Sequence, residues 1–150
     1  MSAYQTVLVG TDGSESSFRA VERAALVARD SRATLLIACA YHPISQREAE
    51  QAKDVLRGEA YQVVGSAPAE DTLRRATDLA RRNGAEAVEV IPVEGSAVDS
   101  LVELAAKRQV DLVVVGNRGL NTLAGRLLGS VPSGVARQAG CDVLIVHTVR

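Results

Sequence analysis

The chain has 150 residues and a mass of 15.8 kDa, the usual size of a single domain. Apolar residues make up 47% and charged residues 23%, which is ordinary for a globular chain and excludes disordered, collagen-like and coiled-coil proteins. The 17 basic and 18 acidic side chains leave a formal net charge of −1. Such a balance gives no global field to hold a polyanion, so we expect neither nucleic acid nor a membrane surface as a partner.

Short apolar runs rich in valine, isoleucine and leucine alternate with longer stretches of helical period. This alternation is typical of a parallel sheet covered by helices on both faces. In chain order we predict a strand at 6–9, a helix at 14–29, a strand at 34–40, a helix at 69–82, a strand at 87–91, a helix at 96–108, a strand at 112–115, a helix at about 132–139 and a strand at 143–147. The predicted fold is therefore a single α/β domain over residues 1–150 with an open five-stranded parallel sheet.

Capping residues mark several of the helix ends. Ser14 or Ser16 is the expected N-cap of the first helix, and Ser96, with the acid Asp99 three residues on, begins the third in the manner of a capping box. The pair Asn83-Gly84 is a C-terminal stop for the second helix.

Residues 41–67 form a longer connection than a plain crossover between parallel strands needs. The first half is charged, and we predict a short helix at 45–59. An insertion at the carboxyl end of a strand acts as a mobile lid over a ligand or is a solvated loop, and both interpretations stay open.

Two strand ends have unusual composition, and ligands of open α/β sheets bind at the carboxyl ends of strands. The first predicted strand ends in Gly10-Thr11-Asp12-Gly13-Ser14, directly before a helix. The fourth is followed by a glycine-rich segment, and residues 112–141 contain three arginines and no acid. Exposed backbone N–H groups, a helix start and positive charge suit an anion such as phosphate, although glycines also serve ordinary turns.

Cys39 and Cys141 lie in apolar runs without a CxxC pair or a histidine at metal-ligand spacing, so we expect reduced core thiols.

Residues 1–9 lack a basic region and a long apolar stretch, and no run of 18 apolar residues occurs, so we expect a cytoplasmic protein. The chain has no Trp, one Phe and three Tyr, so it has few aromatic side chains with which to stack on a flavin ring.

Several enzyme signatures are missing. There is no GxxxxGK[ST] or GxGxxG pattern, and no HxGH signature of nucleotidyl transferases. The segment Ile91-Pro92-Val93 offers no acceptor aspartate for a response-regulator receiver, and neither His42 nor His147 has a nucleophile in a recognisable context.

The spacing Gly116-x2-Gly119-x9-Gly129-Ser130 after a buried strand resembles the ATP-binding signature of the universal stress protein family. The turn Thr11-Asp12-Gly13-Ser14 resembles the family's "TDGS" turn, and the family's order of strands and helices matches the whole chain. The resemblance implies an adenine nucleotide, ATP or cyclic AMP, as the bound ligand.

It also implies a set of ligand-binding residues. These are Gly10, Thr11 and Asp12 beside the ribose and phosphates, the backbone of Ala40 at the adenine edge, Gly116, Asn117, Arg118 and Gly119 around ribose and phosphate, and Gly129, Ser130, Val131 and Ser133 at the phosphate oxygens. Asp12 is expected to reach a sugar hydroxyl or a bound Mg²⁺. Pro132 departs from the pattern, because many nucleotide-binding members have a hydroxyl residue there, so ligands with fewer phosphates stay open.

The function implied is that of a sensor or sequestering module that binds the nucleotide without fast turnover. The resemblance further implies a homodimer built around the last strand, 143–147. Two alternatives stay open: a slow Mg²⁺-dependent ATPase or adenylyl-transferring enzyme on the same fold, and a family member that has lost its nucleotide.

Overall fold

The structure is a computed structural model that describes residues 2–41, 66–117 and 129–148. The described strands form one parallel sheet in the order β3-β2-β1-β4-β5. The strands are β1 (Thr6–Gly10), β2 (Thr34–Tyr41), β3 (Val88–Glu94), β4 (Leu112–Gly116) and β5 (Asp142–Val146). The helices are α1 (Glu15–Ser31), α3 (Ser66–Arg82), α4 (Ala97–Lys107) and α5 (Ser130–Gln138). This arrangement confirms the predicted fold class.

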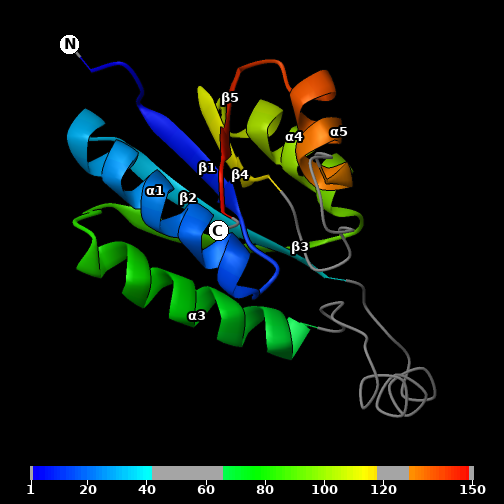
Figure 1. Cartoon of the computed structure of the whole chain (residues 1–150), viewed down its shortest axis with the longest axis horizontal. Coiled ribbons are helices and arrows are strands. Elements are labelled where there is room, and N and C mark those ends of the chain that lie inside the picture. The colour runs from blue at the N-terminus through cyan, green and yellow to red at the C-terminus, as the bar shows by residue number, and fades with distance from the viewer. Residues whose placement is uncertain (1, 42–65, 118–128, 149–150) are drawn as a thin grey trace.

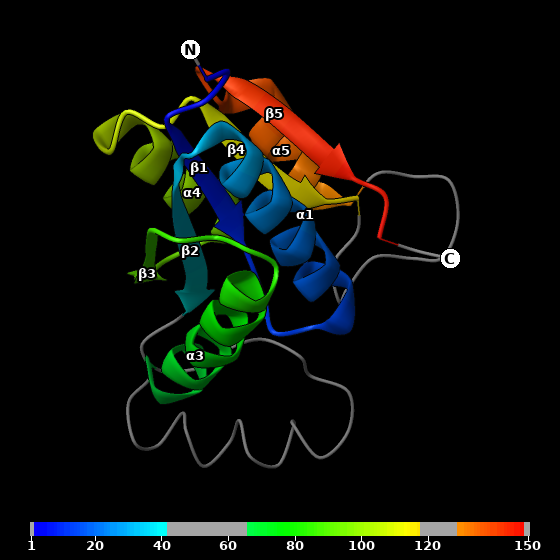
Figure 2. The same cartoon turned by 90° about the vertical axis from the view of Figure 1, so that its left-hand side faces the viewer.

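Helices cover both faces of the sheet (Figures 1 and 2). Helices α1 and α3 lie on one face, and α4 and α5 lie on the other. The side chains of β1 alternate accordingly: Val7 and Val9 belong to the core cluster under α1 and α3, and Leu8 belongs to the cluster under α4 and α5. Each side chain is fully buried, which explains why the central strand is apolar at every position between its ends.

The sequence identified two N-caps correctly. The Ser14 hydroxyl accepts a hydrogen bond from the Ser17 N–H at 3.1 Å, and Ser96 accepts one from the Asp99 N–H at 3.3 Å. Ser16 lies inside α1 and is not the cap. At the other end of α1, Arg32 adopts a left-handed conformation with φ +54° and ends the helix. Glycine is the usual residue at such a position, so the sequence carries no signal for this helix end.

The predicted third strand, 87–91, ended too early, because β3 continues through Pro92 to Glu94. The Ala87 carbonyl accepts from the Leu35 N–H, and the Gly95 N–H donates to the Tyr41 carbonyl. The backbone N–H and C=O groups of odd-numbered residues along this edge therefore point toward β2. The nitrogen of Pro92 therefore points away from β2, where no ladder hydrogen bond is lost.

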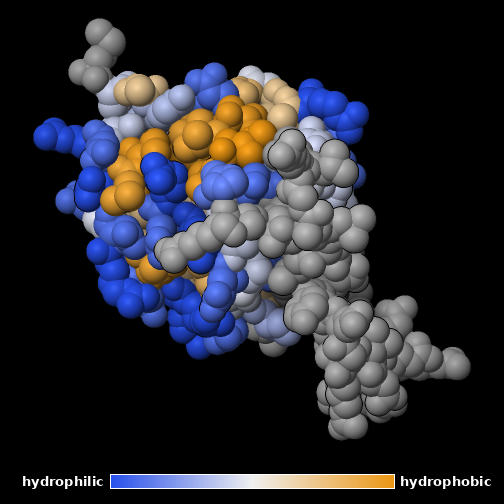
Figure 3. Space-filling view, viewed as in Figure 1, coloured by the Kyte–Doolittle hydropathy of each residue, from blue (hydrophilic) through white to orange (hydrophobic). Residues whose placement is uncertain are grey.

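Strand β5 is the opposite edge of the sheet. Its central residues, Val143, Leu144 and Ile145, are only half-buried. Figure 3 shows an apolar patch over this strand. The predicted helix at 45–59 lies outside the described residues.

Candidate functional site

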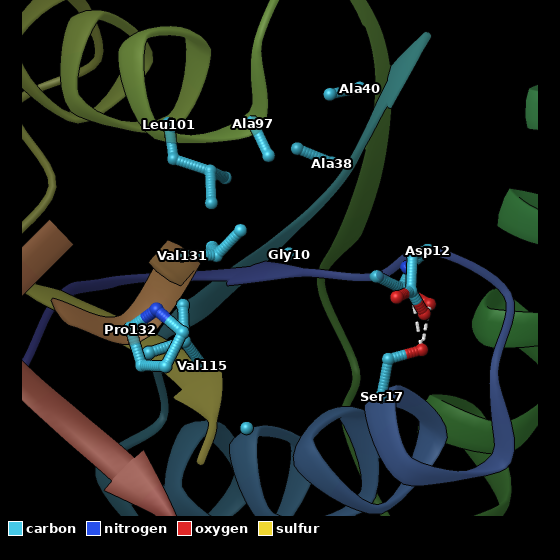
Figure 4. Close-up of a pocket in the computed structure, with 12 residues that line it drawn as sticks. Gly10, Asp12, Ser17, Ala38, Ala40, Ala97, Leu101, Val115, Val131 and Pro132 are labelled. Carbon is cyan, nitrogen blue, oxygen red and sulfur yellow. Dashed lines mark hydrogen bonds between the residues drawn. The ribbon is translucent and has the colours of Figure 1, made fainter. Parts of the chain in front are cut away.

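A pocket of about 110 Å³ lies at the carboxyl ends of β1, β2 and β4, on the face covered by α4 and α5 (Figure 4). The sheet order reverses between β1 and β4, so this is the switch point at which open α/β sheets bind ligands. The lining residues are Gly10, Thr11, Asp12, Ser17, Ala38, Ala40, Ala97, Leu101, Val115, Gly116, Val131 and Pro132.

Small residues at the ends of the strands create the hollow. Leu8 and Leu36 fill the α4 and α5 face deeper in the sheet, but the next positions on that face are Gly10, Ala38 and Ala40. A Cβ placed on Gly10 would lie 2.9 Å from Cδ1 of Leu101, closer than carbon atoms normally approach. The absence of a side chain at Gly10 therefore leaves room for Leu101 and keeps the slot open.

The opposite wall of the pocket is apolar and comes from two helices. Ala97 and Leu101 belong to α4, and Val131 and Pro132 belong to α5 (Figure 4). Of these four residues the sequence analysis named only Val131 as a site residue. In the helix predicted at 96–108, Leu101 is spaced three or four residues from Val98 and Ala105, which indicates a face buried against the sheet but not that this face also lines a ligand slot.

The backbone of Ala40 is open toward the pocket. The Thr34 N–H donates to the carbonyl of Gln5, just before β1, and the Ala38 carbonyl accepts from the Thr11 N–H. The backbone N–H and C=O groups of even-numbered residues of β2 therefore point toward β1. The pairing of these two strands ends at Gly10 and Ala38, where β1 turns away. Among the described residues, the Ala40 N–H has no partner, and its carbonyl has only a weak contact, 3.9 Å from the Cys39 thiol. One donor and one acceptor are thus left facing the slot.

The turn after β1 holds Asp12 at the polar end of the pocket. One carboxylate oxygen, Oδ1, accepts from both the N–H and the hydroxyl of Ser14, at 2.9 and 2.6 Å. The Ser17 hydroxyl donates to the Ser14 carbonyl, so it accepts from the Thr11 hydroxyl, 2.7 Å away. Thr11 in turn accepts from Gly13, which has φ +87°. The turn therefore satisfies its own hydroxyls and leaves Oδ2 of Asp12 for a ligand.

Helix α5 presents its N-terminus near the pocket. Gly129 is the N-cap and has no side chain to cap the helix, and its N–H donates to the Asn117 carbonyl at 3.0 Å. Its carbonyl accepts the first helical hydrogen bond, from Ser133 at 3.1 Å. Because Pro132 has no N–H, the backbone donors left at the helix start are those of Ser130 and Val131.

Asn117 uses its polar groups within the protein. Its N–H donates to the Val146 carbonyl at 2.9 Å. Its Oδ1 accepts from both the N–H and the hydroxyl of Thr148, each at 2.9 Å. Of the two histidines considered above, His147 lies beside this amide, with 3.5 Å between Nδ1 and Nδ2 of Asn117, and His42 lies outside the described residues. The structure therefore places the Asn117 side chain against the end of the chain rather than in the pocket lining.

Most of the other residues expected at the site are brought together. Gly10, Thr11, Asp12, Ala40, Gly116 and Val131 line the pocket, whereas Ser130 and Ser133 lie on α5 outside the lining. Arg118 and Gly119 lie outside the described residues. Asp12 is the ionisable side chain among the described lining residues.

The thiols and the acidic groups do not form a metal site in the described part of the chain, where no cluster of three or more potential ligands occurs. Cys39 and Cys141 are both free thiols; Cys39 is buried in the core, as predicted, whereas Cys141 is only half-buried. Burial, and to a smaller extent the charge of Asp12, raises the pKa of the Cys39 thiol to about 11. Across residues 2–41, 66–117 and 129–148, no helix is long and apolar enough to cross a membrane.

Comparisons with known proteins agree with this fold. A sequence model of the universal stress protein family matches residues 3–147. Universal stress protein Rv1636 of Mycobacterium tuberculosis is 55% identical over 148 residues, and the match covers 99% of each chain. A solved universal stress protein in complex with cAMP is 51% identical, with a TM-score of 0.77 over 99% of this chain and 100% of that one. The fold is also that of the universal stress protein of Archaeoglobus fulgidus in complex with dAMP, which is 21% identical, with a TM-score of 0.65 and coverage of 95% of this chain and 97% of that one.

Proposed function

Because this chain belongs to the universal stress protein family, we propose that it is a binding module for an adenine nucleotide, with cyclic AMP as its tightest ligand. The proposed site is the pocket at the carboxyl ends of β1, β2 and β4, within one domain that spans residues 1–150. In this proposal the protein senses or sequesters the nucleotide.

The open backbone of Ala40 is the observation that carries the proposal. Adenine has a donor, its amino group, beside an acceptor ring nitrogen, and a carbonyl and an N–H can pair with both. The slot next to Ala40 is lined by small and apolar side chains, which suit a flat heterocycle. An apolar slot with a few placed polar groups is the usual form of a small-molecule site.

The ribose and phosphate are assigned to the polar end. In this proposal Oδ2 of Asp12, which no described group contacts, accepts from a ribose hydroxyl, and the N–H groups of Ser130 and Val131 donate to phosphate oxygens. Two helix-start donors suit the single charge of a cyclic phosphodiester better than a triphosphate, which needs more donors. The solved relative at 51% identity carries cAMP, which supports this choice. ATP is the second ligand in the proposal, with Mg²⁺ held at Asp12.

The proposal excludes fast turnover. Hydrolysis of a phosphoryl bond needs a group that orients or activates water. Among the described lining residues only Asp12 carries an ionisable group, and Oδ1 of that carboxylate already accepts two hydrogen bonds. We expect binding with little or no release of phosphate.

Calorimetry of the nucleotide-free protein tests the function. ATP, ADP, AMP and cyclic AMP are titrated with and without Mg²⁺, and released phosphate is assayed in the ATP sample. Saturable binding of cyclic AMP without phosphate release supports the proposal. Rapid phosphate release would show that the protein is an enzyme instead. If none of the four nucleotides binds, the proposal of an adenine-nucleotide ligand is wrong.

A pair of glycine variants tests the location. Gly116 lines the pocket at the end of β4, so we expect the side chain and negative charge added by Gly116→Asp to abolish binding of the anionic ligand. Gly140→Asp is the matched control, because a Cβ there would meet no atom within 4 Å. If Gly116→Asp folds and binds with unchanged affinity, the site lies elsewhere.

The proposal includes a homodimer that pairs along β5. This strand is a sheet edge with half-buried apolar residues, and Figure 3 shows the apolar patch over it. Leu144→Asp should yield a monomer in sedimentation equilibrium, whereas Val90→Asp, at an apolar residue of the opposite edge that is 41% exposed, should not. A wild-type monomer would contradict this part of the proposal.

We place the module in the cytoplasm, without a nucleic-acid or membrane partner. Cell fractionation and a DNA mobility-shift assay at low salt test these two points. Recovery with the membrane fraction or a mobility shift would contradict them.

A further inference from the structure

Asn117 contacts three separate parts of the fold through its backbone and side chain. Its N–H donates to Val146 at the end of β5, and its carbonyl accepts from Gly129, the N-cap of α5. Its Oδ1 accepts from both the N–H and the hydroxyl of Thr148. The orientation of the amide follows from these contacts, because only an oxygen can accept from the Thr148 N–H.

Thr148 is buried although it lies near the end of the chain, with 3% of its surface exposed. Its hydroxyl donates to Asn117, so at its other contact it accepts from the Ser16 hydroxyl, 2.5 Å away. Its carbonyl accepts from Nη1 of Arg19 at 2.6 Å. Both Ser16 and Arg19 lie in the first turns of α1. A continuous chain of hydrogen bonds therefore runs from the start of α1 through Thr148 to Asn117 and on to the start of α5.

The two helix starts joined in this way flank the pocket. The start of α1 holds Ser17, whose hydroxyl supports the Asp12 turn, and the start of α5 holds Val131 and Pro132. Asn117 itself is absent from the lining, and its polar atoms are already bonded within the protein.

We propose that Asn117 is a positioning residue for this pocket, which sets the place of the α5 N-terminus relative to the Asp12 turn and is held for that purpose by Thr148. The consequence for a ligand rests on the nucleotide site proposed above. Residues just after β5 thereby influence ligand affinity from outside the pocket. The chain's last strand and its ligand site are coupled through one residue, whose backbone carbonyl accepts from the α5 N-cap and whose side-chain oxygen accepts from Thr148.

Thr148→Val tests the link with a substitution of similar shape. It removes the hydroxyl that joins Ser16 to Asn117, and it keeps the backbone N–H that donates to Oδ1. Two measurements are made below the unfolding temperature: the affinity for cyclic AMP, and the hydrogen-exchange rate of the Gly129 amide in the ligand-free protein. We expect affinity to fall about three- to tenfold, the weight of one neutral hydrogen bond, and exchange at Gly129 to accelerate by a similar factor.

Two further variants separate positioning from general stability. Thr148→Ser restores the hydroxyl and should restore both values. Thr77→Val also loses one hydroxyl hydrogen bond, the 2.8 Å bond from Thr77 to the Leu73 carbonyl, but it lies on α3 away from the pocket lining, so both values should stay at the wild-type level.

The exchange measurement keeps the two proposals distinguishable. If the wild-type protein binds no nucleotide, the function proposed above fails, while faster exchange at Gly129 in Thr148→Val still supports the positioning role. Unchanged exchange at Gly129 in Thr148→Val overturns the positioning role, whatever the affinity. Equal effects in Thr148→Val and Thr77→Val would also overturn it, because the loss would then be one of general stability.

Discussion

Replacing Gly10 by alanine should damage ligand binding more than folding. Gly10 lines the pocket at the end of β1 and faces Leu101 of α4. The new methyl group would lie 2.9 Å from Cδ1 and 3.3 Å from Cδ2 of that leucine. Since packed carbon atoms prefer about 3.5–4.0 Å, Cδ1 must retreat by about 0.6 Å.

The direction in which the Leu101 side chain moves decides whether the substitution lowers the stability of the fold or the affinity for the ligand. Leu101 is 4% exposed, and the open space beside it is the pocket of about 110 Å³. Overpacking costs about 1–3 kcal/mol, but replacing glycine stabilises by about 0.4–1 kcal/mol through the unfolded chain. We therefore expect the free energy of unfolding to fall by about 1 kcal/mol. Because the leucine moves into the slot, cyclic AMP affinity should fall about tenfold, or 1.4 kcal/mol.

Urea denaturation and calorimetry with cyclic AMP measure the two quantities separately. Gly140→Ala is the control for the change in backbone freedom, because no atom lies within 4 Å of its Cβ position. Adding Leu101→Ala to the Gly10→Ala protein should recover part of the lost affinity by reopening the slot. Wild-type affinity in a folded Gly10→Ala protein would refute the reasoning, because it would show that the ligand does not use the space beside Leu101.

Three further predictions concern the caps, the thiols and an ion pair. Ser14→Ala should lower the free energy of unfolding by about 1 kcal/mol in urea denaturation, and Ser96→Ala should lower it less, because the cap distance is 3.1 Å at Ser14 and 3.3 Å at Ser96; equal losses would contradict the ranking. Iodoacetamide at pH 8 should modify the half-exposed Cys141 first in a mass-spectrometric time course, since a pKa of about 11 leaves about one buried Cys39 thiol in a thousand ionised; faster labelling of Cys39 would show that β2 opens. The Arg108 guanidinium, 2.6 and 3.0 Å from the two oxygens of Glu89, holds the pKa of that carboxyl below its ordinary value. The pair therefore stabilises the fold above the unfolded-state pKa of a glutamate, and this contribution is lost as the pH falls through the lowered folded-state pKa. Arg108→Gln should raise the pKa of Glu89 in a carboxyl NMR titration, and an unmoved value would mean that the pair does not persist in solution.

Local signals in the sequence were sufficient for the architecture. Alternating apolar runs and helical periods predicted the five strands and the described helices, because burial on both faces of a central strand requires apolar residues at every position. Ser14 and Ser96 were recognisable as caps, because a cap depends only on the residues of the next turn. Edges were less predictable: β3 runs past Pro92 only because its nitrogen points away from β2, a property of the register and not of the local sequence.

Some features of the site could likewise be recognised in the sequence, and others depend on tertiary packing. The Asp12 turn and the glycines near β4 could be found from the chain itself, since glycine-rich turns at strand ends mark close backbone approach. The apolar wall of Ala97 and Leu101 could not, because its place over the slot depends on how α4 packs across the sheet. The Ala40 backbone was expected at the site only through the family resemblance, because its unpaired N–H exists only where β1 leaves β2 after Gly10.

Asn117 shows the limit most clearly. The sequence, through the family resemblance, assigned it to the ligand, whereas the structure places its side chain on Thr148, 31 residues away in the chain. Composition, periodicity and capping act over a few residues, so the sequence by itself determined the order and kind of the elements. Which backbone groups stay unpaired, which side chains share a wall and which residue joins two helix starts depend on contacts between distant residues, and only the packed tertiary structure decided those.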